Sequence, residues 1–162
     1  MQLDELFVAM TEFNRGNAHQ IQHFTKVHAY AAFIGRREGL DERTQRVLEA
    51  AALVHDIGIT PAMEKYGRSD GPLQEKEGEP IALELLNRLG MDRDEAKRVS
   101  FLVGTHHTLR GVEGIDHAIL LEADMLVNLH EGAAPRERAE KALEEVFVTQ
   151  TGKKLCRDMY GI

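Results

Sequence analysis

The sequence predicts an all-α protein, and three observations support this fold class. Apolar residues recur at three- and four-residue steps along almost the whole chain, as on the buried face of a helix. Glycines, prolines and N-cap residues such as Asp41 and Asp92 separate these segments. No two alternating segments are joined by a hairpin turn. We therefore expect one single-domain helical bundle over residues 1–162.

The first predicted helices follow one another closely. An amphipathic helix ends near Gly16, and a second covers about residues 18–37. Asp41 is placed to cap a third helix, which ends just beyond His55 and Asp56.

The middle of the chain predicts a loop and then further helices. Residues 61–79 are polar and rich in glycine, which predicts a loop carrying one short helix. A helix over residues 81–89 follows, and Asp92 caps another that runs to about His107.

The last part of the chain is predicted to be helical as well. Residues 115–130 are apolar almost throughout and should form the central, most buried helix. Pro135 opens another helix, and a last short helix follows Gly152. We expect the core that carries chemistry to span about residues 18–130, with helices over 135–160 packed beside it.

Composition excludes several classes of protein. The chain has 20 Lys+Arg and 27 Asp+Glu, a net charge of −7, which disfavours a duplex nucleic-acid partner. No segment approaches the roughly 20 apolar residues that a bilayer span needs, so we expect no membrane partner. One cysteine cannot form an intrachain disulfide, and the N-terminal segment is acidic where a signal peptide is basic. We therefore expect a cytoplasmic protein.

Two acidic positions suggest metal binding. His55 and Asp56 stand where a strongly apolar helix ends, and imidazole with carboxylate suits borderline divalent metals. An exposed, inert pair is the alternative for this dipeptide. Asp124 lies within AILLEADMLVNL, where a buried carboxylate needs a metal, an arginine or a hydrogen-bond network. Glu122 should face the opposite side, toward solvent or a partner.

Histidines strengthen this interpretation. His23 and His28 lie on the predicted second helix, too far apart around it to bind one ion together, and His106 and His107 end the fifth. The order along the chain is His, His-Asp, His-His and Asp, each on a separate predicted helix. Such a set indicates one or two metal ions inside a bundle.

Four segments resemble the HD-domain superfamily of metal-dependent phosphohydrolases. They are HFTKV at 23–27, ALVHDIG at 52–58, HH at 106–107 and EAD at 122–124. HFTKV matches the family's H-x-x-(Arg/Lys)-Val pattern. The resemblance therefore implies a metal shell of His23, His55, Asp56 and Asp124, with His28 as the alternative first ligand. The ion would be Mn, Fe, Co, Ni, Mg or Zn, with one per chain favoured over two.

The implied reaction is hydrolysis of a phosphomonoester or pyrophosphate bond by a metal-activated water. The substrate would be a nucleotide or another small phosphate ester. Asp56 would bind the metal and orient the water, and His106, or else His107, would donate a proton or hold a second ion. Two-metal relatives usually carry a further histidine between the HD dipeptide and the paired histidines, but this chain has none from Ile57 to Thr105. Glu77, Glu79 or Asp70 would have to substitute for it, and Glu77 lies close to the expected place.

Basic residues are expected near the substrate phosphate. Lys26 follows the first ligand, and Lys65 and Arg68 lie in the predicted loop, while His107 adjoins the proton donor. Solvent-facing lysines and plain loop solubility are the alternatives for these residues.

Differences from the sequence motifs of two known subfamilies argue against the activities of those subfamilies. The chain reads HHTLRGVEG where cyclic-dinucleotide phosphodiesterases have Gly-Tyr-Pro, and it lacks the Glu-Asp that follows the HD dipeptide in alarmone hydrolases. Two other classes remain open, an HD-type di-iron oxygenase and a non-catalytic metal-binding signalling or scaffold module. The sequence is also compatible with a homo-oligomer.

Overall fold

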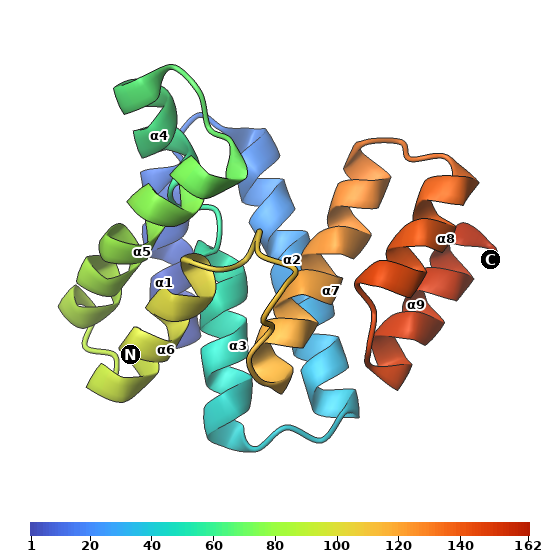
Figure 1. The fold of residues 1–162 in the computed structure, drawn as a ribbon. Helices are drawn as coiled ribbons and strands as arrows, with labels where there is room; N and C mark the ends of the chain where they lie inside the picture. Colours follow the sequence, from blue (N-terminus) through green and yellow to red (C-terminus); the bar gives the residue numbers. More distant parts are fainter.

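The computed structural model describes all 162 residues and contains nine α-helices and no strand (Figure 1). The helices are α1 (Leu3–Phe13), α2 (Ala18–Arg37), α3 (Glu42–Val54), α4 (Ile59–Tyr66), α5 (Gly71–Arg88), α6 (Arg93–Val103), α7 (Ile115–Glu131), α8 (Arg136–Glu145) and α9 (Gln150–Tyr160). The predicted all-α fold class is confirmed. No helix combines the length and the apolar character needed to cross a bilayer.

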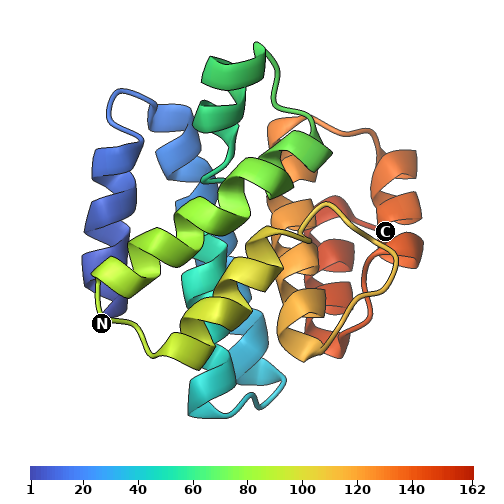
Figure 2. The same ribbon diagram turned by 60° about the vertical axis from the view of Figure 1, so that its left-hand side comes forward.

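Three helices form the centre of the bundle. The helix α2 packs against both α3 and α7, and α3 also contacts α7. In Figures 1 and 2, α1 and α4–α6 cover one side of this group while α8 and α9 cover the other. The helix α7 is buried over most of its length, as its apolar sequence predicts. Residues on these three helices therefore meet in the interior.

Aspartate side chains begin two of the helices as predicted. The Asp41 carboxylate accepts hydrogen bonds from two backbone amides in the first turn of α3. The Asp92 carboxylate does the same for α6. Each cap satisfies amides that have no partner within the helix.

The loop expected over residues 61–79 is wrong, because α5 already begins at Gly71. The reason is that Gly58 and Gly78 allow α5 to pack closely against its neighbours. A Cβ on Gly78 would lie 2.9 Å from Val103 Cγ1, and one on Gly58 would lie 2.1 Å from the Gln74 carbonyl oxygen. Without those carbons, α5 crosses closely over the turn that follows α3.

Two helix boundaries also differ from the prediction. The helix α6 ends at Val103 instead of near His107, and the His106 ring then bonds to the Val103 carbonyl. The helix α9 includes Gly152, because the Thr149 hydroxyl caps it by accepting from the Gly152 amide.

Glu122 is fully buried and paired, so the expected solvent-facing alternative is wrong. Its Oε1 accepts from the amides of Val148 and Thr149, and its Oε2 accepts from the Thr149 hydroxyl. Burial raises the pKa of the Glu122 carboxyl despite these bonds. These hydrogen bonds link Glu122 on α7 to the segment that precedes α9.

Candidate metal centre

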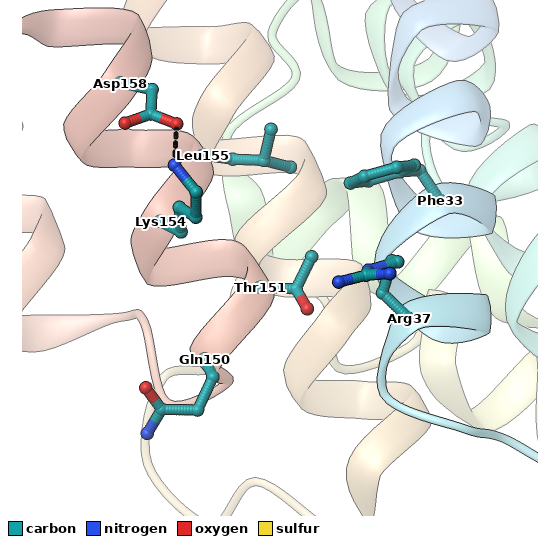
Figure 3. Close-up of a pocket in the computed structure, with 7 residues that line it drawn as sticks. All are labelled: Phe33, Arg37, Gln150, Thr151, Lys154, Leu155 and Asp158. Carbon is teal, nitrogen blue, oxygen red and sulfur yellow. Dashed lines mark hydrogen bonds and ion pairs between the residues drawn. The ribbon is translucent and has the colours of Figure 1, made fainter.

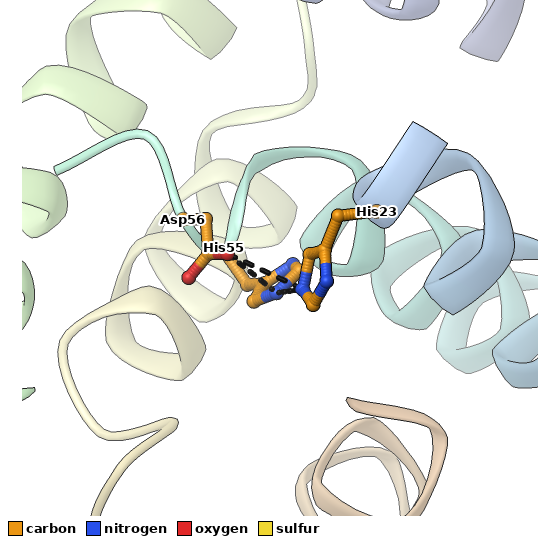
Figure 4. Close-up of side chains that lie close together, drawn as sticks. All are labelled: His23, His55 and Asp56. Atoms are coloured by element: carbon orange, nitrogen blue, oxygen red, sulfur yellow. Dashed lines mark hydrogen bonds and ion pairs between the residues drawn. The ribbon is translucent and has the colours of Figure 1, made fainter. Parts of the chain in front are cut away.

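Side chains from three helices converge on one buried point. His23 comes from α2, His55 and Asp56 follow directly on α3, and Asp124 comes from α7. Figure 4 shows His23, His55 and Asp56 with their polar atoms close together. The helix packing thus assembles residues that lie up to about a hundred positions apart in the sequence.

The Nε2 atom of each histidine lies 3.2–3.5 Å from that of the other histidine and from one oxygen of each aspartate. His23 Nε2 is 3.2 Å from His55 Nε2, 3.3 Å from Asp56 Oδ2 and 3.2 Å from Asp124 Oδ1. His55 Nε2 is 3.4 Å from Asp56 Oδ2 and 3.5 Å from Asp124 Oδ1. We call these four residues the metal cluster.

This spacing and these atoms suit a divalent cation. Donors bound to one ion at about 2.1 Å lie about 3.0–3.4 Å apart in octahedral or tetrahedral geometry. Asp124 Oδ1 is buried and has no hydrogen-bond partner, which is costly unless a cation meets it. The set of two imidazoles and two carboxylates is also the chemistry that Mn, Fe, Co, Ni and Zn accept. The residues therefore fit the metal that the resemblance implies.

Within the metal cluster, the aspartates stabilise the protonated form of His55, and the histidines stabilise the ionised form of Asp56. Burial by itself would lower the pKa of His55, but the negative charges of Asp56 and Asp124 raise it to about 9. Burial would raise the pKa of the Asp56 carboxyl, yet the neighbouring histidines hold it well below its usual range. Both carboxyl groups of the cluster, that of Asp124 included, are ionised at neutral pH.

His106 lies beside the metal cluster with its Nε2 unpartnered. Its Nδ1 donates to the Val103 carbonyl at 2.7 Å, so in the neutral ring Nε2 carries a lone pair. This buried Nε2 is 3.4 Å from Asp56 Oδ1. Two acceptors facing each other need a proton or a cation between them.

A second group of donors shares Asp56. It consists of Asp56, His106 and His107. The His107 ring lies beside that of His106, and its Nε2 is 2.7 Å from Gln74 Oε1. This group offers fewer carboxylates than the metal cluster, and His107 is exposed.

Three other predicted residues lie outside both donor groups. Glu77 accepts hydrogen bonds from Tyr66 at 2.7 Å and Lys65 at 3.1 Å. Arg68 pairs with Asp70 at 3.3 Å and is largely exposed. These contacts place Lys65 at the end of α4, where Glu77 of α5 faces it, and Arg68 in the segment between α4 and α5.

On α2, His28 and Lys26 also have partners of their own. His28 lies against Glu49 at 3.1 Å and is not in the metal cluster. Lys26 pairs with Glu131 at 2.8 Å.

Two residues that contact the cluster were not found from the sequence. Gln20 Nε2 donates to Asp56 Oδ2 at 2.8 Å, and Glu131 Oε2 accepts from His23 Nδ1 at 2.9 Å. Gln20 precedes His23 by three residues, and Glu131 follows Asp124 by seven, so each shares a helix face with a ligand. That spacing is the signal that could have found them.

A hollow of about 440 Å³ lies elsewhere, between α2 and α9 (Figure 3). Its lining residues are Phe33, Arg37, Gln150, Thr151, Lys154, Leu155 and Asp158. Phe33 lies ten residues beyond His23 on α2, a distance of about 15 Å along the helix. The hollow does not border the metal cluster.

Fold and site together define an all-α protein with a buried cluster of histidines and aspartates that could hold a divalent metal ion. The profile of the family described as HD domain matches residues 21–150, which include all four residues of the metal cluster. The chain belongs to this family.

Two solved structures are similar over nearly the whole chain. One is the crystal structure of a predicted HD superfamily hydrolase from an uncultured Thermotogales bacterium, with 27% identity and a TM-score of 0.74. The match covers 98% of this chain and 85% of that one. The other is Bacillus subtilis YpgQ in complex with ADP, with 17% identity, a TM-score of 0.69, and coverage of 98% and 87%. Among curated proteins, no match is found.

Proposed function

We propose that the protein is a metal-dependent phosphohydrolase acting on a nucleotide or another small phosphate ester. The observation that carries this proposal is the convergence of His23, His55, Asp56 and Asp124 on one buried point. Membership of the HD-domain family, and similarity to a structure described as a predicted HD superfamily hydrolase, support the reaction class. The ADP bound to the similar YpgQ structure is compatible with a nucleotide substrate. The bond cleaved is a phosphomonoester or a pyrophosphate bond.

A divalent ion bound at the cluster supplies a Lewis acid for a phosphate oxygen and lowers the pKa of a bound water. The orientation of the Asp56 carboxylate is fixed by a hydrogen bond that its Oδ2 accepts from Gln20 Nε2. Its Oδ1 faces His106 and is placed to accept a hydrogen bond from the attacking water. Asp56 therefore orients the nucleophile.

His106 is the proton donor for the leaving oxygen. The Val103 carbonyl fixes its Nδ1 as a donor, so Nε2 is the atom that gains and loses the catalytic proton. The ring is buried beside the metal cluster, so it would face the leaving oxygen of a phosphate ester held there.

Exposed cations near α4 and α5 bind the rest of the phosphate. Lys65 and Arg68 keep side chains in solvent, and His107 lies beside the proton donor. Glu77, with its oxygen bonded to Lys65 and Tyr66, contributes by holding that lysine in place. In this arrangement Glu77 is not needed as a metal ligand.

A single preparation tests the proposal. The protein, purified without chelator or nickel affinity resin, is assayed for metal content and then for phosphate or pyrophosphate release from nucleoside mono-, di- and triphosphates. We expect about one Mn, Co, Ni, Mg or Zn per chain and hydrolysis of at least one substrate. Hydrolysis should disappear in Asp56→Ala.

Two other outcomes would contradict the proposal. About two irons per chain, with oxygen consumption and no phosphate release, would indicate a di-iron oxygenase that also uses Asp56, His106 and His107. Metal binding without turnover of any phosphate ester would indicate a non-catalytic module.

A further inference from the structure

His23 is the one histidine of the metal cluster whose outer nitrogen meets a charged side chain. Its Nε2 points into the cluster, whereas its Nδ1 lies 2.9 Å from Glu131 Oε2. His55 instead donates its Nδ1 proton to the carbonyl of Ala52 at 2.9 Å. The orientation of His23 therefore depends on a side chain from another helix.

The partner of His23 remains a carboxylate. The Lys26 ammonium lies 2.8 Å from Glu131 Oε1, and this ion pair favours the ionised carboxylate that faces His23 Nδ1. A carboxylate only accepts hydrogen bonds, so His23 Nδ1 must carry the proton. The Nε2 lone pair is then left facing the metal cluster. One tautomer, the one that can bind a metal, is selected.

Glu131 is itself held in place by α2. Its Oε1 is 2.8 Å from Lys26 Nζ, and its Oε2 is 3.6 Å from His19 Nε2. Lys26 follows His23 by three residues and so lies on the same side of α2. The Glu131 side chain is only 15% exposed. Lys26 is thus engaged in an ion pair behind the ligand.

The helix α7 contributes to both sides of the His23 ring. Asp124 and Glu131 are seven residues apart, two helical turns, and share one face. Asp124 contacts His23 Nε2, and Glu131 contacts His23 Nδ1. The packing of α7 on α2 therefore fixes the imidazole between two carboxylates.

We propose that Glu131 is a positioning residue that orients His23 and increases its basicity toward the metal, with Lys26 holding Glu131 in place. This inference rests on the metal centre of the proposed function. Residues in this outer position typically change metal affinity by about 10- to 100-fold. Lys26 then serves the metal centre from behind and does not bind the substrate phosphate.

The test is a titration of the metal-depleted full-length protein with Mn²⁺ by calorimetry, and with Co²⁺ by visible absorption. We expect Glu131→Ala to weaken the affinity for both ions about 10- to 100-fold and to alter the Co²⁺ spectrum. Glu131→Gln, which keeps an acceptor oxygen but loses the charge, should weaken affinity less. Lys26→Met should weaken affinity several-fold. The matched control is Glu140→Gln, which breaks the exposed pair with Arg136 and should change nothing.

The outcomes separate this inference from the proposed function. Unchanged affinity and an unchanged Co²⁺ spectrum in Glu131→Ala and Glu131→Gln would overturn the positioning role while leaving the metal centre intact. An unchanged metal affinity in Lys26→Met with a raised KM would assign Lys26 to the substrate instead. If the wild-type protein binds neither ion, the proposed function itself fails. Should Glu131→Ala not fold, the Gln and Met variants decide the matter.

Discussion

His55 and His106 are held in the same way at the ends of two different helices. Each ring donates its Nδ1 proton to the carbonyl three residues earlier, at 2.9 Å for His55 and 2.7 Å for His106. Each then directs Nε2 at one oxygen of Asp56, at 3.4 Å in both cases. Asp56 thus links the metal cluster to the proposed proton donor.

Replacement of His106 should separate proton transfer from metal binding. We expect His106→Ala to lower kcat about 100-fold or more, because general acid catalysis contributes roughly 10²- to 10⁴-fold. Affinity for Mn²⁺ should change little, since His106 is outside the metal cluster. The measurement is kcat together with a calorimetric Kd. A large loss of Mn²⁺ affinity with one ion per chain would instead make His106 a ligand.

Lys65 and Arg68 should act on substrate binding alone. Loss of one hydrogen bond to a charged group costs about 1.5–3 kcal/mol, so Lys65→Met or Arg68→Met should raise KM about 10-fold or more. We expect kcat to stay within about two-fold, because neither residue belongs to the metal cluster or is the proposed proton donor. Lys141→Met, an exposed lysine of α8, is the control. Steady-state kinetics that show an unchanged KM would contradict this role.

Gly78 should not tolerate a side chain. In a helix interior Gly→Ala usually stabilises by about 0.5–1 kcal/mol, but overpacking costs about 1–3 kcal/mol. The added carbon would meet Val103 at 2.9 Å and the Gly58 amide nitrogen at 3.3 Å. We expect Gly78→Ala to lower the free energy of unfolding by about 1–2 kcal/mol in urea titrations. Glu84→Ala, exposed on the same helix, serves as the control. A stabilised Gly78→Ala protein would rule out the close packing.

His117 should make stability depend on pH. The ring is buried, accepts from the Glu113 amide and contacts the Thr105 carbonyl. Burial lowers its pKa, with a further contribution from the Arg98 charge. The folded protein therefore binds this proton less readily than the unfolded chain. Its stabilising contribution is present above about pH 6.5 and is lost as the pH falls through the lower folded-state pKa.

The matching measurement compares wild type with His117→Gln. Free energies of unfolding at pH 7.5 and pH 5.5 should show a larger loss on acidification in the wild-type protein. The contributions of the other titrating groups to the pH dependence of the free energy of unfolding are the same in both proteins and cancel in this comparison. An equal or smaller loss in the wild type would mean that His117 is not held neutral.

The spacing of apolar residues and the helix caps were sufficient to predict most helices, because the buried residues of α2, α3 and α7 recur at helical spacing. The start of α5 was missed because Gly58 and Gly78 allow close helix packing, and sequence alone cannot distinguish that use of glycine from a turn. Single-domain organisation, cytoplasmic location and oligomeric state stay predictions.

The members of the metal cluster could be named because four short segments matched a family pattern. Gln20 and Glu131 could not, since each acts across an interface between helices that only the fold brings together. Lys26 illustrates the same limit. The phosphate-binding role predicted from its position three residues after His23 stays a prediction, and its contact in the structure is Glu131 on α7.

A Mn²⁺ titration of the metal-depleted wild-type protein beside Asp124→Asn tests directly whether the metal cluster binds an ion. Asp124 Oδ1 is a buried oxygen of the metal cluster without a hydrogen-bond partner, so removal of its charge should affect the metal more than the fold. We expect one tightly bound ion per wild-type chain, at least about 100-fold weaker binding in the variant, and loss of phosphate release. Equal Mn²⁺ affinity and equal hydrolysis in both proteins would contradict the account.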